Sequence, residues 1–297
     1  LQLPQVVDVS STRLRELLAR GEGWEYLSPA VYGYILREGL YGTRADLKRL
    51  PLRELRPIAL SYLKNKRIPH VLGTEQEAIR LAERYGADVE KARVAALLHD
   101  CTKKLNMEEQ LELCGRYGIQ LDELEQEALK LLHAKTGAAI ARDVFGVDDE
   151  IYNAIWWHTT GHAHMTLLEK VIYLADYIEP SRNFPGVDKL RAVCYKDLDE
   201  GLLMGLEMTI EEMTEMGNPV HHATIEAEET EPPDAAAEAA DRGSRGTGHR
   251  ADRGGGLPEP VRSPGSAGEE RGCGQRDPGR GDRLGRGDPP PQRRGAE

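Results

Sequence analysis

The chain has 297 residues, of which 39% are hydrophobic and 30% are charged, and its formal net charge is −11. This length suggests one or two domains and is enough to bury a hydrophobic core. The negative charge argues against general binding of DNA or of a membrane surface by the whole chain, although a local basic cluster can still hold phosphates.

The apolar runs and the cysteines indicate the cellular compartment in which the protein is expected. No run approaches 18 consecutive apolar residues and no charged-then-apolar leader opens the chain, so we expect neither a membrane span nor a signal peptide. Cys101, Cys114, Cys194 and Cys273 form no CxxC pair, which fits a reducing compartment and excludes a cysteine-based zinc module. We therefore expect a cytoplasmic protein.

The first 42 residues begin with a β-prone run, which leads into Ser10, Ser11 and Thr12 and then into a helical pattern. One of these hydroxyls is expected to cap the helix, and the exposed N–H groups of such a helix start favour an anion. From spacing alone, an ordinary helix cap is the simpler interpretation.

The same segment carries a Ser-Ser-Thr-x-x-Arg element at residues 10–15 and the run Tyr26-Leu27-Ser28-Pro29. In these it resembles the C-terminal end of bacterial nicotinate-nucleotide adenylyltransferases. The resemblance implies phosphate contacts from Ser10, Ser11, Thr12 and Arg15. The body of such an enzyme is absent from the chain, so we expect residues 1–42 to be the end of a fused or truncated domain and the polar residues 43–54 to be a linker.

Residues 55–227 show a helical pattern throughout. Gly86 predicts a helix end and Asp88 the cap of the next helix, whose small residues allow a neighbouring helix to pack close to His99. No clear alternating strand appears, so we predict an all-α domain. Further helices are expected at residues 107–117, 122–145 with a break near His133, 148–158, 166–178 and 197–216.

The doublet His99-Asp100 ends the run 92–100 and can offer one nitrogen and one oxygen to a divalent cation, a donor set that suits Fe, Mn or Zn. Asp176 follows the apolar run 167–175, and a carboxylate buried there needs a cation or hydrogen-bond partners. A single histidine is more often a packing or surface residue than a ligand. The candidates for the remaining ligands are His70, His133, His158 and Asp176.

Most of these candidates lie in four short sequence motifs. The motifs are Leu97-Leu98-His99-Asp100-x-x-Lys103, Leu132-His133-Ala134, Trp157-His158-Thr159 and Asp176-Tyr177-Ile178-Glu179-Pro180-x-Arg182. The set resembles the HD superfamily of metal-dependent phosphohydrolases, and within it the YqeK-type bacterial symmetrical diadenosine-tetraphosphate hydrolases. The resemblance implies an HD-domain helical bundle that holds iron, with Mn or Zn as other candidates. The ligands it implies are His70, His99, Asp100 and Asp176.

The same resemblance implies hydrolysis of diadenosine tetraphosphate to two ADP by metal-activated water, with a small dinucleotide as partner. Such chemistry needs a nucleophile, charge neutralisation and a stabilised leaving phosphate. The resemblance implies catalytic roles for Asp100, Lys103, His133 and His158. Substrate contacts fall on Arg67, Lys103, His133, His158, Thr159, Arg182 and the loop Pro219, Val220, His221, His222, Ala223 and Thr224, which reads Val-His-His-Ala-Thr where the family has Ile-His-Pro-x-Thr.

Several alternatives stay open at this point. His133 and His158 can instead bind a second metal ion, although we prefer roles facing phosphate. A separate zinc site at His158, His162 and His164 is disfavoured because Gly161 interrupts the helix and no Cys or carboxylate completes it. The protein can also be a phosphohydrolase for another nucleotide, or a silent nucleotide-binding module of a split or fused adenylyltransferase.

Residues 228–297 contain no Ile, Phe, Met, Trp, Tyr or Lys and are rich in Gly, Arg, Asp, Glu, Pro and Ala. Such a segment buries too little apolar surface to offset its ordering entropy, so we predict a disordered, low-complexity tail. RNA binding of RGG type is disfavoured because acidic residues offset the arginines and no aromatics are present for stacking. A homodimer remains an open expectation.

Overall fold

The computed structural model describes residues 9–230. The start of the β-prone run, Cys273 and all but the first three residues of the predicted tail lie outside the described residues. Residues 228–230 form the end of a helix rather than the start of a tail. No helix in residues 9–230 is both long enough and apolar enough to cross a membrane.

Within the described residues the structure is helical and contains no strand, which confirms the all-α prediction. The α-helices are α1 (Ser11–Leu18), α2 (Pro29–Arg37), α3 (Leu52–Ser61), α4 (Ile68–Tyr85), α5 (Val89–Leu98), α6 (Met107–Tyr117), α7 (Leu129–Phe145), α8 (Asp149–Trp156), α9 (Leu167–Ile178), α10 (Val187–Lys196), α11 (Leu198–Glu215) and α12 (His222–Thr230). Short 3-10 helices are η1 (Trp24–Tyr26), η2 (Leu40–Gly42), η3 (Leu47–Arg49) and η4 (Asn65–Arg67).

The predicted helix ends are built by the expected local chemistry. Gly86 ends α4 with φ 78°, a left-handed conformation that glycine adopts without strain. The carboxylate of Asp88 accepts a hydrogen bond from the Lys91 backbone N–H at 2.9 Å and so caps α5. Ser10 caps α1 in the same way, accepting from the Arg13 backbone N–H at 3.1 Å.

The helix expected over residues 122–145 was wrong over its first seven residues, and α7 begins only at Leu129. Asp122 and Glu125 bond each other's backbone N–H groups, at 3.1 and 2.8 Å, in a local turn. Ala128 then adopts φ −99° and ψ 77°, which is not helical. The expected break near His133 is absent, since this residue lies inside α7, and α10 is a helix that we did not predict.

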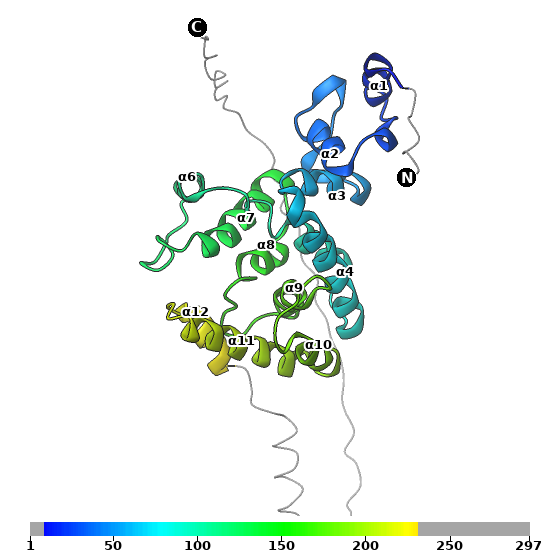
Figure 1. Ribbon diagram of the computed structural model, residues 1–297. Coiled ribbons are helices and arrows are strands. Elements are labelled where there is room, and N and C mark those ends of the chain that lie inside the picture. The colour runs from blue at the N-terminus through cyan, green and yellow to red at the C-terminus, as the bar shows by residue number, and fades with distance from the viewer. Residues whose placement is uncertain (1–8, 231–297) are drawn as a thin grey trace, which may run out of the picture. The chain divides into compact units, whose positions relative to one another are not determined.

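The core lies where α4, α5 and α9 pack together, with α8 and α11 against them. In Figure 1, α9 lies beside α4, and α10 and α11 lie below it. The helix α5 is apolar on several sides because its neighbours surround it, and Ala92, Ala95 and Ala96 are fully buried. These small side chains let α4 and α9 pack close to α5, which brings the facing residues of α4 and α9 close together.

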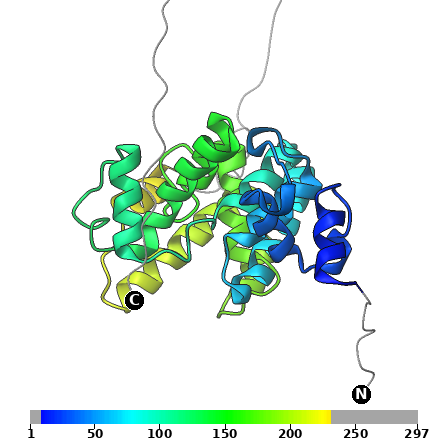
Figure 2. The same cartoon turned by 90° about the horizontal axis from the view of Figure 1, so that it is seen from above.

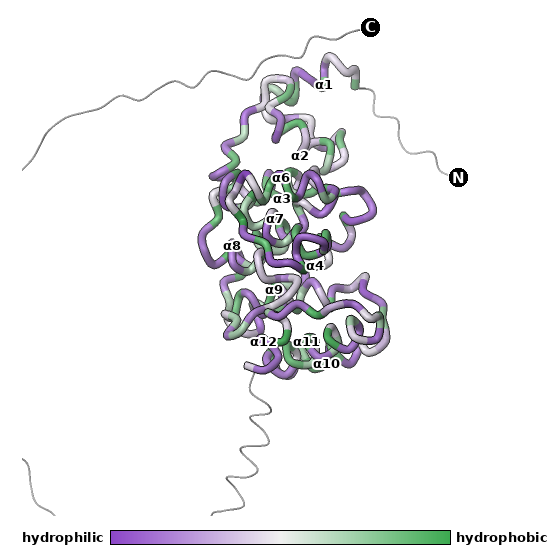
Figure 3. Tube along the Cα trace, turned by 90° about the vertical axis from the view of Figure 1, so that its left-hand side faces the viewer, coloured by the Kyte–Doolittle hydropathy of each residue, from purple (hydrophilic) through white to green (hydrophobic). Residues whose placement is uncertain are grey.

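The N-terminal helices belong to the same compact unit as the rest of the described residues. Seen from above, they lie on one side of the cyan and green helices (Figure 2). Hydrophobic and hydrophilic stretches alternate along the helices, as expected when each helix buries one face (Figure 3). Leu36 of α2 joins the main core, and η3 and the start of α3 lie within the segment predicted as a linker.

The contact between α2 and α3 depends on Gly33. A Cβ atom at this position would lie only 1.8 Å from the backbone oxygen of Pro57. The backbones of the two helices therefore meet directly, and no side chain fits between them.

We predict that Gly33→Ala lowers the free energy of unfolding by about 1 to 3 kcal/mol, because the added methyl overpacks the contact between α2 and α3. The matched control is Gly115→Ala in α6, where a Cβ meets nothing within 4 Å. That change should raise stability by up to about 1 kcal/mol, the helix propensity difference between the two residues. Urea unfolding measures both, and shifts of the same sign would contradict this account of the α2–α3 contact.

Candidate functional site

Three helices bring the predicted metal ligands together. His70 lies in the first turn of α4, His99 and Asp100 follow the last turn of α5, and Asp176 lies near the end of α9. His70 Nε2 is 2.8 Å from an oxygen of Asp176 and 3.9 Å from an oxygen of Asp100. His99 Nε2 is 3.5 Å from Asp100 and 3.8 Å from Asp176. Two imidazoles and two carboxylates therefore converge on one point.

The two rings are oriented by hydrogen bonds on their other nitrogen. His70 Nδ1 lies 3.0 Å from the carboxylate of Glu179, and His99 Nδ1 donates to the Ala96 carbonyl at 2.7 Å. With Nδ1 as the donor, each Nε2 presents a lone pair. Both Nε2 atoms and Asp100 Oδ1 are buried and make no hydrogen bond, an arrangement that is costly unless a cation satisfies it. This donor set fits a divalent Fe, Mn or Zn ion.

The charges in this centre are coupled. Burial opposes ionisation of Asp100 and Asp176, but His99 and the other nearby donors outweigh it and hold the pKa of both carboxyls well below the usual range. Burial likewise opposes protonation of His99, yet the Asp100 carboxylate raises its pKa. Both carboxylates are therefore ionised at neutral pH, which favours a cation between the four side chains.

His133 and His158 lie next to these ligands. Their Nε2 atoms are 3.1 Å apart, and His133 Nε2 is 3.2 Å from an oxygen of Asp100 and 2.9 Å from the amine of Lys103. Burial lowers the pKa of both histidines, and the neighbouring His99 ring adds to the effect on His158. Burial also lowers the pKa of Lys103. His99, Asp100 and His158 form a second possible ligand group, so the geometry keeps open a second ion beside the first.

Two arginines neutralise the carboxylates from the outside. Arg67 donates to Asp100 through Nε, and Arg182 donates to Asp176 through Nη2 at 2.8 Å. Arg182 also donates through Nε to the backbone carbonyl of Asp176 at 2.8 Å. Both guanidinium groups are partly exposed, so they remain accessible to an anionic ligand.

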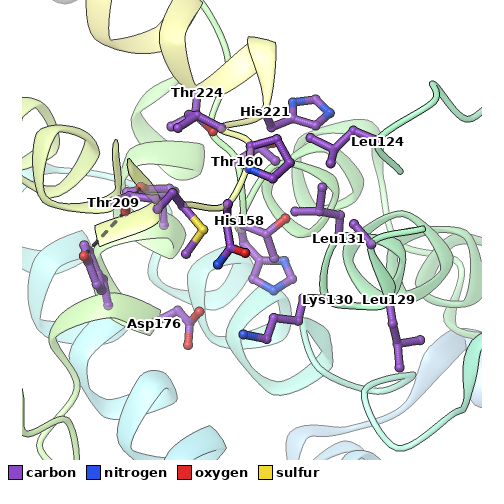
Figure 4. Close-up of a pocket in the computed structure, with 18 of the residues that line it drawn as sticks. Leu124, Leu129, Lys130, Leu131, His158, Thr160, Asp176, Thr209, His221 and Thr224 are labelled. Carbon is purple, nitrogen blue, oxygen red and sulfur yellow. Dashed lines mark hydrogen bonds between the residues drawn. The ribbon is translucent and has the colours of Figure 1, made fainter. Parts of the chain in front are cut away.

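A pocket of about 660 Å³ opens beside this centre, a size typical of small-molecule sites. His158 and Asp176 line one part of it, and His221 and Thr224 lie at another edge, with Leu124, Leu129 and Leu131 along one wall (Figure 4). The pocket therefore combines a charged end with apolar walls.

The structure brings most of the predicted contact residues to this pocket and leaves some of them off it. Pocket-lining residues among those predicted are Lys103, His158, Thr159, Asp176, Arg182, Pro219, Val220, His221 and Thr224. Predicted residues that do not line it are Arg67, His70, His99, Asp100, His133, His222 and Ala223. Of these, His222 is 64% exposed and Ala223 is buried.

The segment that reads Val-His-His-Ala-Thr is a loop only as far as His221, because α12 begins at His222 and contains the rest of the predicted loop. His221 fixes this segment. Its Nδ1 accepts the backbone N–H of Ala223 at 3.1 Å, so its Nε2 carries the proton and faces Asp122 at 3.2 Å and Glu125 at 3.3 Å. Although burial opposes ionisation of Glu125, His221 and Lys135 lower its pKa to about 2. Asp122, His221 and His222 lie close enough to suggest a metal group, but a protonated Nε2 makes this a hydrogen-bond network that joins two walls of the pocket.

The disfavoured zinc site of His158, His162 and His164 does not form among the described residues. One premise was wrong, since a carboxylate is present: His162 Nε2 lies 3.1 Å from Glu169. Glu169 also accepts the Thr166 backbone N–H at 2.6 Å and is part of the cap of α9. His162 is therefore tied to a helix cap rather than to a metal.

Glu179 is the functional residue that the sequence reasoning missed. It is fully buried, faces His70 Nδ1, and also accepts hydrogen bonds from the backbone and hydroxyl of Ser181. A Cβ at Gly73 would lie 2.5 Å from its carboxylate, so this glycine makes room for it. The signal in the sequence was a second acidic residue three positions after Asp176, in an otherwise apolar helix end.

Comparisons with known proteins agree with this geometry. Residues 67–181 match the HD domain family. A relative from Bacillus subtilis, "Bis(5'-nucleosyl)-tetraphosphatase, symmetrical", is 42% identical over 164 residues, which cover 55% of this chain and 88% of the relative. A crystal structure described as a predicted HD superfamily hydrolase involved in NAD metabolism, from Clostridium acetobutylicum, has 43% sequence identity and a TM-score of 0.59, and the match covers 61% of this chain and 96% of that chain.

A third relative has a name in two parts. A Mycoplasma genitalium protein named "Probable nicotinate-nucleotide adenylyltransferase/Ap4A hydrolase" is 33% identical over 127 residues, which cover 42% of this chain and 35% of the relative. Its name joins the two enzyme families that the two parts of this sequence resemble.

We predict that Glu179→Gln weakens divalent metal binding by about tenfold or more, because the carboxylate fixes the His70 ring and raises its basicity. The measurement is a competition titration with a chromogenic chelator, with circular dichroism to verify the fold. The matched control is Glu207→Gln, an exposed residue of α11, which should leave metal affinity unchanged. Equal metal affinity in the two variants would contradict a role for Glu179 in holding His70.

Proposed function

Since the chain belongs to the family of symmetrical bis(5'-nucleosyl)-tetraphosphatases, which are HD-domain hydrolases, we propose that it hydrolyses diadenosine tetraphosphate to two molecules of ADP with the help of iron. The observation that carries the proposal is the convergence of His70, His99, Asp100 and Asp176 at the charged end of a pocket. The same four side chains suit Mn or Zn, so iron rests on the family resemblance.

These four side chains hold the metal through His70 Nε2, His99 Nε2 and the carboxylates of Asp100 and Asp176. When bound, a divalent metal lowers the pKa of a water to supply the nucleophile and neutralises phosphate charge. The water oxygen forms a bond to one of the two central phosphorus atoms, and the bond from that phosphorus to the bridging oxygen breaks. The bridging oxygen leaves with the second ADP, so both products are ADP.

The residues around the metal ligands position the phosphates. Lys103 and Arg182 reach the pocket and can donate hydrogen bonds to phosphate oxygens, and Arg67 approaches the same carboxylates from outside it. Arginine suits such contacts because its guanidinium donates two parallel hydrogen bonds. His158 donates through Nδ1 to the Ile155 carbonyl at 2.6 Å, so it can donate to a phosphate oxygen only when its Nε2 is also protonated. We assign His133 and His158 to the phosphates rather than to a second ion.

We assign the adenosine part of the substrate to the less charged part of the pocket. Thr159 and the loop of residues 219–224 provide polar groups there, next to the apolar wall formed by Leu124, Leu129 and Leu131. The hydrogen bonds of His221 to Asp122 and Glu125 support this assignment, since they hold the loop against that wall.

The domain organisation is part of the proposal. Residues 55–227 form the hydrolase, and residues 43–54 join it to residues 1–42, which resemble the C-terminal end of an adenylyltransferase. The double name of the Mycoplasma relative supports such a fusion. Three buried cysteines without disulfides support a cytoplasmic location, and a homodimer stays a prediction.

Two other hypotheses about the function predict different results in the same assay. A phosphohydrolase for another nucleotide, such as a deoxynucleoside monophosphate, would turn over that nucleotide in preference. A silent nucleotide-binding module would bind without turnover. The presence of all four ligand side chains, with buried atoms that lack hydrogen bonds, favours an active enzyme.

We predict that the purified full chain, loaded with iron, converts diadenosine tetraphosphate to ADP as the sole nucleotide product, because cleavage lies at the middle of the tetraphosphate. Ion-exchange chromatography of the products, with a panel of other nucleotides, makes the measurement. ATP together with AMP, or no turnover, contradicts the proposal.

The loss-of-metal control for this assay is Asp100→Ala. It removes a ligand and should abolish metal content and turnover together, while circular dichroism reports whether the helices remain. Unchanged metal content in this variant would refute the assignment of Asp100 as a ligand.

A further inference from the structure

Three lysine or arginine side chains line the pocket, and two of them already have partners. Lys103 contacts His133 at 2.9 Å and lies 3.9 Å from Asp100, and Arg182 donates to Asp176 at 2.8 Å. The third is Lys130. Among the described residues it has no carboxylate within ion-pair distance, although Glu127 lies three positions before it on the same wall.

The place of Lys130 in α7 fixes its distance from the metal ligands. It lies in the first turn of α7, three residues before His133, so the two side chains share one face of the helix. At 1.5 Å per residue, Lys130 lies about 4.5 Å further along the helix axis. His133 contacts Asp100 and so lies next to the buried ligands. Lys130 lies further from these ligands along the helix and is exposed to solvent.

Lys130 is also the cation on a wall of the pocket that otherwise consists of apolar residues and Glu127. Leu129 and Leu131 flank it, and Figure 4 shows its side chain extending into the pocket. An ammonium group between apolar residues at the edge of a cavity is a favourable place for an anion.

We propose that Lys130 binds the phosphates of the substrate half that is not held at the metal ligands. The inference rests on the proposed function, because a tetraphosphate bridged between two nucleosides has two phosphates on each side of the bond that breaks. The cations beside the metal ligands, Lys103 and Arg182, are assigned to the phosphates of the half held there. The departing half therefore needs a separate cation, and Lys130 selects a second charged half over a single ADP.

The test compares two ligands that differ by that half. A methylene-bridged diadenosine tetraphosphate, which cannot be cleaved at its centre, spans both halves, and ADP fills one. Isothermal titration of the metal-loaded full chain measures both affinities for the wild type, Lys130→Gln and Lys130→Arg. The matched control is Lys189→Gln, which removes the same charge from an exposed position of α10 outside the pocket.

We expect Lys130→Gln to weaken binding of the bridged analogue about tenfold, the loss that corresponds to one hydrogen bond to a charged group. Binding of the first ADP should stay unchanged, Lys130→Arg should restore the analogue's affinity, and Lys189→Gln should match the wild type. Equal weakening of both ligands would place Lys130 on the half at the metal and overturn the inference, as would no effect on either. The products formed by the wild type test the proposed function separately, so the two can fail independently.

Discussion

Two buried carboxylates, Asp100 and Asp176, set the main constraint on this structure. Ionised carboxylates in a helical core are costly, and the cost is offset only where cations and donors surround them. His70 and His99 approach from inside, and Arg67 and Arg182 from outside. Two ring nitrogens and one carboxylate oxygen nevertheless lack hydrogen bonds. The centre is therefore suited to a positive ion, and the surrounding helices position the side chains that could hold it.

The packing of the core serves the same end. The alanine face of α5 lets α4 and α9 close around His99, which has no exposed surface. Gly73 leaves space in α4 for the carboxylate of Glu179, which in turn orients His70. A metal ligand set drawn from three helices is thus held by contacts between backbones and by a buried acid behind one histidine. The pocket adds a less charged region, whose walls are joined through His221.

The sequence carried enough information for the fold class and for the four candidate ligand side chains, which the fold brings together. Gly86, Asp88 and the His-Asp doublet act locally, so their roles follow from neighbouring residues. Other features depend on contacts that sequence spacing does not reveal. Glu179 meets His70 across 109 positions, and the role of Lys130 appears only once the pocket is formed. Asp122 and Glu125 form the reciprocal bonds that typically start a helix, but the backbone leaves the helical conformation at Ala128, so the helix predicted from residue 122 begins only at Leu129.

Anomalous scattering from crystals of the iron-loaded protein, recorded on both sides of the iron absorption edge, tests the central claim most directly. The account predicts one strong peak per chain, within bonding distance of His70 Nε2, His99 Nε2 and the carboxylates of Asp100 and Asp176. A second peak between His133 and His158 would contradict the assignment of these residues to phosphate. A peak elsewhere, with none at the four ligands, would contradict the account as a whole.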